Sequence, residues 1–561
     1  IGDVTRSRLK NIKVLFFLGV NDNCIPKAKG APGLLTERER ERMEKEGVTL
    51  APDAEKESYN EQFYLYLALT KASEQVILTY SVMTSKGESK RPSYLINRVK
   101  QVFPKLVVEK EESDTSYEKI MGSDKGKSYL ISHLADGTYA KDVIWWEIAS
   151  HYEKKTPGIL KDLLRIREKR AGNNSLKKEA AKRLFGDVLY GSVTRFEQYV
   201  QCPFAFFAHY GLLLNERQQY EISSLDHGNL FHQAMEHLSH ELEQRNKNWQ
   251  DLSEEEAVSL AAECVDAVAE RYQGRKYFQS NRVSFMLKRL KNEVVHSVWA
   301  MWHQMQEGDF VQTYTDKEWE SMCIPFGEDA KICLNGVIDR VDLCSLPGEK
   351  LIKIIDYKSS DSQDLLLAKV YYGLQMQLLT YLEAAKEMVE KEHEGKEAVP
   401  AAMLYYVIKE KNLDWKPESE EEYEKRVLDS MKCKGYVNEE PEIIGHLDKS
   451  VVNGGELIPG QKSGVVPVAV DKKGLLKKNS GTLSTKDFET LIAHTKEKMK
   501  ECGKAILDGK IEAIPYVYED NDGCTYCPYG SVCGHESKKD GVREMKKMSD
   551  DEVWEALYGD N

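Results

Sequence analysis

No run of about 18 consecutive apolar residues occurs in the 561-residue sequence, which argues against a membrane-spanning helix. An excess of basic residues is also missing, because 92 Asp and Glu outnumber 79 Lys and Arg and give a formal net charge of −13. This balance argues against a uniformly basic DNA-coating surface, although it is compatible with a local basic channel. The chain begins at Ile1 without a methionine or a signal-type segment, so we expect a piece of a longer protein.

A disulfide framework is not expected either. The eleven cysteines are an odd number, scattered through a chain long enough for two or more domains with large cores. This usage favours the reducing cytoplasm and mostly free thiols. Seven of them lack any metal-ligand spacing and should be packing residues: Cys24, Cys264, Cys323, Cys333, Cys344, Cys433 and Cys502.

The sequence also lacks a phosphate-binding loop. Segment 122–128 has three residues between its glycines where four are required, and we interpret it as a loop. Residues 1–100 read as α/β, with an apolar helix over 63–71 followed by a strand over 76–80. This helix end resembles the last part of a superfamily-1 helicase core, but Lys71 stands where an arginine usually contacts the nucleotide. We therefore expect no ATPase activity from this chain alone.

What the sequence does contain is a charged motif at the end of an apolar run. The run 351–355 continues into Asp356-Tyr357-Lys358. Side chains alternate along a strand, so Asp356 and Lys358 share one face. A carboxylate that holds a divalent cation, beside a lysine that orients the attacking water, suits phosphodiester hydrolysis. From the residues alone, an ordinary Asp–Lys ion pair at a strand edge is an equally good interpretation.

A second apolar run, 332–343, lies just upstream and is joined to the first by segment 345–349, which contains Pro and Gly. This pattern predicts a β-hairpin. Antiparallel pairing would bring Asp339 close to Asp356 and supply the oxygens that one or two Mg²⁺ ions need. Asp342 should face the other way and is the weaker ligand candidate.

The pattern Gly-x-x-Asp-Arg-x-Asp from Gly336, followed by Ile-Asp-Tyr-Lys-Ser from Ile355, resembles the RecB-type branch of the PD-(D/E)XK nucleases. Two helical motifs extend the resemblance. His232 lies four residues from both Gly228 and Glu236, where Glu236 would be a supporting group, and Gln377 and Tyr381 lie four apart on a helix predicted over 372–389. The resemblance implies the catalytic residues Asp339, Asp356, Lys358, His232, Gln377 and Tyr381, and the metal ligands His232, Asp339, Asp356 and Tyr357.

Three cysteines form a Cys-x₂-Cys-x₅-Cys pattern, Cys524, Cys527 and Cys533, in a Gly/Pro-containing loop. A fourth ligand must come from elsewhere, and Cys202 in a Cys-Pro turn is the candidate, with His535 as an alternative in a zinc site. Spacing alone leaves zinc and an iron–sulfur cluster equally open. One cysteine before the nuclease motifs and three after them resembles the iron-staple nucleases, which implies a structural [4Fe–4S] cluster that closes a very long loop.

The order of these motifs resembles the C-terminal half of the AddB-type subunits of AddAB helicase–nucleases. We expect an α/β protein with a helicase-like portion (1–105), a helical connector (106–190), a nuclease domain with a mixed sheet flanked by helices and an iron–sulfur staple (191–540) and a tail (541–561). Near the start of the nuclease domain, Thr194 and Glu197 form a capping-box pattern.

The resemblance implies a Mg²⁺-dependent DNA exonuclease that acts beside an AddA-type subunit in double-strand-break resection and recombinational repair. It would cut the 5′-terminated strand among the single-stranded ends that unwinding produces. Two alternatives stay open at this point: a catalytically inactive DNA-binding or partner-clamping subunit, and a stand-alone exonuclease like the iron–sulfur nucleases of CRISPR adaptation.

Overall fold

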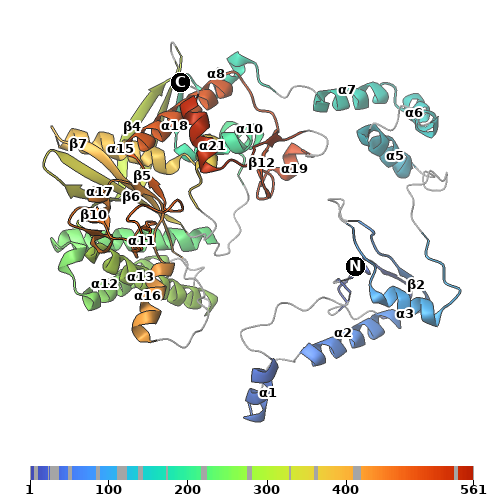
Figure 1. Cartoon of the computed structure of the whole chain (residues 1–561). Coiled ribbons are helices and arrows are strands. Elements are labelled where there is room, and N and C mark those ends of the chain that lie inside the picture. The colour runs from blue at the N-terminus through green and yellow to red at the C-terminus, as the bar shows by residue number, and fades with distance from the viewer. Residues whose placement is uncertain are drawn as a thin grey trace. The chain divides into compact units, whose positions relative to one another are not determined.

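The computed structural model describes residues 2–4, 10–22, 24–25, 37–48, 54–83, 89–109, 123–136, 143–171, 175–215, 224–273, 281–327, 330–358, 364–393, 395–408, 419–535 and 541–559. It divides into two compact units, Ile1–Lys154 and Lys155–Asn561, which are considered separately below (Figure 1). Within these ranges, no helix combines the length and the apolar character needed to span a bilayer.

The first unit is built on two parallel strands, β1 (Ile12–Phe17) and β2 (Ala72–Leu78). Parallel neighbours need a crossover, which includes α1 (Glu37–Lys45) and α2 (Ala54–Leu69). A small core of Phe17, Val20, Leu65 and Ile96 lies between these elements and α3 (Tyr94–Val102). Further along are α5 (Ser123–Asp136) and α6 (Val143–Lys155), so the segment expected to be a loop is helical from Ser123 onward.

The second unit contains a seven-stranded mixed sheet in the order β11-β8-β7-β6-β5-β3, with β4 paired to the β5 strand as well. These strands are β3 (Val188–Gly191), β4 (Val311–Pro325), β5 (Lys331–Ser345), β6 (Glu349–Lys358), β7 (Glu397–Val407), β8 (Lys434–Asn438) and β11 (Thr482–Leu483). Strands β6 and β7 are parallel, whereas β5 pairs antiparallel with both β4 and β6. The sheet is therefore mixed, as the nuclease resemblance implies.

Helices cover both faces of this sheet (Figure 1). One apolar cluster joins the sheet to α9 (Val193–Gln201), α15 (Gln377–Glu392) and α18 (Thr485–Leu507). The other joins its opposite face to α11 (Ser224–Gln244), α12 (Glu254–Gln273) and α13 (Asn281–Gln306). Burial of these two apolar faces is the main stabilisation of the unit, and it places α9 and α15 on one side of the β5–β6 hairpin and α11 on the other.

Shorter elements complete the second unit. The helices are α7 (Ile159–Ala171), α8 (Lys178–Phe185), α10 (Pro203–Phe206) with a π-helical turn at Phe207–Gly211, α14 (Leu367–Tyr371), α16 (Glu420–Ser430), α17 (Pro441–Leu447), α19 (Gly530–Cys533) and α21 (Asp550–Gly559), with 3₁₀ turns at Trp249–Asp251 and Lys449–Val451. The strands are β9 (Val452–Asn453), β10 (Glu456–Leu457), β12 (Tyr516–Tyr518), β13 (Asn521–Asp522) and β14 (Arg543–Glu544). Helix α8 and strand β3, from the expected connector, and α21, from the expected tail, all pack against this unit.

Two expected elements differ from the structure. The helix expected over 372–389 begins only at Gln377, because Gly373 has a φ of 78° and interrupts it in a turn after α14. The capping box of Thr194 and Glu197 does not form, because Ser192 occupies the N-cap of α9 and makes no side-chain cap there. Glu197 is thereby left for another partner.

The cysteines also differ in part from expectation. Cys323 on β4 and Cys333 on β5 are register partners and form a disulfide, so these two are not free packing thiols. The sequence analysis missed this pairing because it did not identify β4. Four of the other cysteines are buried as expected (Cys264, Cys344, Cys433 and Cys502), whereas Cys24 is exposed.

Candidate active site

Asp339 and Asp356 lie side by side because β5 and β6 pair antiparallel with Arg340 opposite Ile355. Oδ2 of Asp339 accepts the backbone N–H of Tyr357 at 2.8 Å. Burial raises the pKa of both carboxyl groups, and the charge of Asp339 raises that of Asp356 further. Two buried carboxylates that repel each other are the kind of pair that a divalent cation stabilises.

Lys358 connects this pair to α15. Its Nζ lies 2.6 Å from Oδ2 of Asp356 and donates to Oε1 of Gln377 at 2.9 Å. Gln377 in turn donates from Nε2 to the Tyr381 hydroxyl at 3.0 Å. The structure thus brings Asp356, Lys358, Gln377 and Tyr381 together in one hydrogen-bonded chain, and the amide holds the lysine in place beside the carboxylate.

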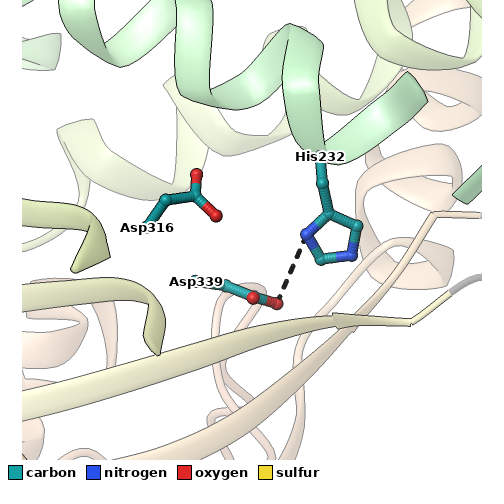
Figure 2. Close-up of side chains that lie close together, drawn as sticks. All are labelled: His232, Asp316 and Asp339. Carbon is teal, nitrogen blue, oxygen red and sulfur yellow. Dashed lines mark ion pairs between the residues drawn. The ribbon is translucent and has the colours of Figure 1, made fainter. Parts of the chain in front are cut away.

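His232 on α11 reaches the same place from the other side of the hairpin. Its Nδ1 is 3.6 Å from Oδ2 of Asp339, and burial lowers the pKa of the imidazole. A neutral imidazole keeps a lone pair for a metal ion. Asp316 on β4 joins them, since ligand atoms of His232, Asp316 and Asp339 all lie within 4.8 Å of one another (Figure 2).

Tyr357 lies between the two strand-end charges, but its side chain points the other way. The ring packs against Phe231 and Tyr406, and the phenol lies beside Arg340. The phenol therefore does not reach the carboxylates, and only a main-chain atom of Tyr357 is suited to act as a ligand.

Asp342 does not belong to this site. It is fully buried, accepts from Arg340 at 2.7 and 3.0 Å and pairs with Lys353 at 2.7 Å. The guanidinium of Arg340 also lies over the Trp249 ring. Asp342 therefore neutralises two cations in the core on the opposite face of β5.

Glu197 is a contributor that the sequence analysis missed. From α9, its Oε1 accepts the backbone N–H groups of Met376 (2.6 Å) and Gln377 (3.1 Å) at the start of α15. Burial raises the pKa of this carboxyl to about 7, against the opposing effect of the two N–H groups and of Lys358. Glu197 thus fixes the end of the helix that positions Gln377, and no local sequence signal identifies it because its partners lie far along the chain.

We expect Glu197→Ala to lower the cleavage rate by about tenfold to a hundredfold, as loss of a group supporting an active-site side chain does. It should also lower the free energy of unfolding by about 1–3 kcal/mol, because two buried N–H groups lose their acceptor. Glu197→Gln keeps an acceptor and should restore most of both. Cleavage kinetics and thermal melting of the two variants measure this, and equal cleavage by Glu197→Ala and wild type would contradict it.

The same residue gives an expected pH dependence. The folded carboxyl has a pKa of about 7 against an ordinary value of 4.5, so the folded state binds the proton more tightly. This contribution to stability is full below pH 4.5 and is lost as the pH rises through about 7. Glu197→Gln should therefore show a flatter stability profile between these limits than wild type does.

The four metal-spaced cysteines are brought together by the second unit. Cys202 and Tyr529 are buried in one small cluster with Cys527 at its edge, and the Tyr529 hydroxyl donates to the Leu214 carbonyl at 3.0 Å. Burial raises the pKa of Cys524 to about 11, with Asp522 and the other three cysteines acting in the same direction.

Backbone N–H groups point at these sulfur atoms. His535 donates its N–H to Sγ of Cys533 at 3.3 Å. The N–H groups of Ala205 and Phe204 oppose the effect of burial on the pKa of Cys202. Donors aimed at thiolates are typical of metal-bound cysteines, so the donor set fits a soft metal centre.

The hard-ligand site also fits the group that its fold implies. It offers carboxylate oxygens and a neutral imidazole on a strand pair beside a lysine. Oxygen-rich donor sets of this kind suit Mg²⁺ or Mn²⁺ rather than a soft metal.

Hairpin, ligands, lysine and flanking helices together define a metal-dependent nuclease of the PD-(D/E)XK class. A family model for the PD-(D/E)XK nuclease superfamily matches residues 191–534, more than half of the chain, and the chain belongs to this superfamily. The fold expected from the sequence is thereby confirmed.

The chain is further similar to AddB proteins, the second of the two subunits of ATP-dependent helicase/deoxyribonucleases. It is 35% identical to that of Lachnoclostridium phytofermentans over 99% of this chain and 48% of the relative. For Clostridium perfringens the identity is 32% over 99% and 49%, and for Alkaliphilus oremlandii 28% over 100% and 50%. The resemblance to these proteins is confirmed, and the chain spans about half the length of the curated relatives it matches.

Proposed function

We propose that the chain hydrolyses DNA phosphodiester bonds with Mg²⁺ as part of a helicase–nuclease that resects double-strand breaks for recombinational repair in the cytoplasm. The observation that carries this proposal is the convergence of Asp339, Asp356 and Lys358 at the β5–β6 hairpin, with His232 and Gln377 closing the site from two helices. The names of its relatives support the DNA substrate and the helicase context.

The residues divide the work by their chemistry. His232, Asp339, Asp356 and the main chain of Tyr357 would hold one or two Mg²⁺ ions, which supply Lewis-acid activation of the phosphate and of water. Lys358, held by Gln377, orients the attacking water and stabilises negative charge on the phosphate. Tyr381 fixes the amide of Gln377 through its hydroxyl, and its position next to the lysine suits contact with a phosphate oxygen.

The test uses linear duplex DNA labelled at either the 5′ or the 3′ end, incubated with the purified protein and its partner in Mg²⁺ or in EDTA. We expect Mg²⁺-dependent shortening from free ends, with the 5′-terminated strand cut. Circular DNA should remain intact. Cleavage in EDTA, or equal cutting of circles, would contradict a metal-dependent exonuclease.

We further propose that Cys202, Cys524, Cys527 and Cys533 hold a [4Fe–4S] cluster. The proximity of the four thiols and the N–H groups aimed at them support this, and Arg543 strengthens the same region by donating to the carbonyl of Val200. The cluster would contribute structure rather than chemistry, because it joins the start of the nuclease domain to its end.

The partner in this proposal is an AddA-type subunit that supplies unwinding, with single-stranded ends as the shared substrate. Lys71, in the first unit, follows α2 at the position where helicases of this class use arginine. With no Walker loop in the sequence, the chain by itself should depend on its partner for ATP.

Accordingly, we expect the isolated chain neither to bind ATP tightly nor to hydrolyse it, since a point-charge lysine does not reproduce the planar fork of arginine. Titration calorimetry with ATP and Mg²⁺, and a phosphate-release assay with single-stranded DNA present, measure this. The partner subunit assayed alone provides the positive control. Stoichiometric ATP binding by the isolated chain would overturn the expectation.

A further inference from the structure

Asp316 occupies an unusual place on β4. Thr315 pairs with Arg340 and Lys317 with Ile338, so Asp316 lies opposite Asp339 on the neighbouring strand. Its φ is 44°, a left-handed conformation that Asp and Asn adopt more readily than most residues do. The backbone of β4 is thus locally turned at the one residue that faces the active-site carboxylate.

The side chain of Asp316 points at the site rather than at a cation. Figure 2 shows its carboxylate directed toward His232 and Asp339, and ligand atoms of all three lie within 4.8 Å of one another. In the described part of the chain, no Lys or Arg nitrogen lies within 4 Å of this carboxylate. By contrast, Asp356 has Lys358, and Asp342 has two cations.

Crowding of this kind is unfavourable without a positive charge. The carboxylate of Asp316 is half-buried and faces Asp339, with Glu236 also contributing negative potential. Like charges at such distances repel strongly where water is partly excluded. A divalent cation between the three side chains would replace that repulsion with attraction, and His232 and two carboxylates form a ligand set suited to Mn²⁺ or Mg²⁺.

We propose that Asp316 is a third side-chain ligand of a divalent cation held by His232 and Asp339, so that the β4 strand takes part in metal binding. This inference rests on the proposed function, because it assumes that Asp339 lies in the metal site. It assigns a role to a strand that carries none of the motif residues of the nuclease family resemblance.

The test measures binding of Mn²⁺ alone to the purified protein by titration calorimetry, without DNA. Asp316→Asn should bind Mn²⁺ about tenfold to a hundredfold more weakly, the range seen when a group of a metal site is lost. Asparagine tolerates the same positive φ, so the fold should be kept. Glu318→Gln, which removes the same charge from an exposed side chain two residues along β4, should bind like wild type.

Two further measurements separate the outcomes. In EDTA, Asp316→Asn should melt no lower than wild type, because a repelling charge has been removed. Asp339→Asn should also lose Mn²⁺ binding. If Asp316→Asn binds Mn²⁺ like wild type while Asp339→Asn does not, the role of Asp316 is wrong but the site stands. If both bind like wild type, the metal site itself is misplaced.

Discussion

Asp356→Ala should abolish Mg²⁺-dependent DNA cleavage, by at least about 10²- to 10⁴-fold, the range for a group acting directly on the reaction. The carboxylate is almost fully buried, which by itself predicts a loss of stability, but its charge there is unfavourable beside Asp339. Lys358 also keeps Gln377 as a partner. We therefore expect thermal stability and DNA binding in Ca²⁺ close to those of wild type.

Asp339→Ala and Lys358→Ala should behave alike, whereas Glu349→Ala provides a control at the exposed start of the same strand, β6. Asp342→Ala separates catalysis from folding. The alternation of side chains predicts a milder effect on cleavage there, but the structure adds a cost in stability, because Arg340 and Lys353 would be left buried without a counter-charge. Breaking such a cluster costs about 3–5 kcal/mol. Comparable cleavage by Asp356→Ala and wild type would exclude the proposed site.

The parts of the site that the sequence predicted are those encoded within a single element or hairpin. Alternation along a strand placed Asp356 and Lys358 on one face, and the short turn between two apolar runs specified an antiparallel pair. Helix α18 was bounded correctly at 485–507, where Ser484 and Asp487 form a capping box that local sequence alone determines.

The residues that sequence analysis missed depend on contacts between distant segments. Glu197 bonds N–H groups that lie about 180 positions further along the chain, so its helix suggested only a local cap. Asp316 is defined by the register between β4 and β5, which includes two irregularities and was not visible as a simple alternation. The Cys323–Cys333 disulfide depends on that same register.

A third kind of difference came from a single backbone angle. The apolar periodicity of 372–389 is continuous through Gly373, and nothing in it marks an interruption. The turn at Gly373 ends α14 and lets α15 begin at Gln377, where Glu197 accepts the first N–H groups. Gln377 therefore stands at the start of a helix rather than in its first turns, which directs its amide toward Lys358.

The second large effect is expected at the cysteines. Cys202 lies at the end of α9 and the other three in the segment that follows β13, so a shared cluster would fix the two ends of the nuclease domain together. The protein contacts between these ends include polar ones, such as the hydrogen bond between His209 and the Tyr529 hydroxyl at 2.9 Å. Linking residues this far apart restricts the unfolded chain by roughly 5 kcal/mol in the chain-entropy estimate.

Replacing any one of Cys202, Cys524, Cys527 or Cys533 with alanine should therefore remove the broad visible absorbance of the purified protein and lower its melting temperature. A domain stable by about 5–15 kcal/mol should feel such a loss as local or global unfolding, so DNA binding should fall as well. Cys502→Ala is the matched control, because it removes a buried thiol from α18 outside the cluster and should keep the colour. A colourless wild-type protein containing zinc would instead favour a structural zinc site. If Cys524→Ala lost its iron yet melted and bound DNA like wild type, the cluster would not hold the domain together, and a redox or sensing role would become the better explanation.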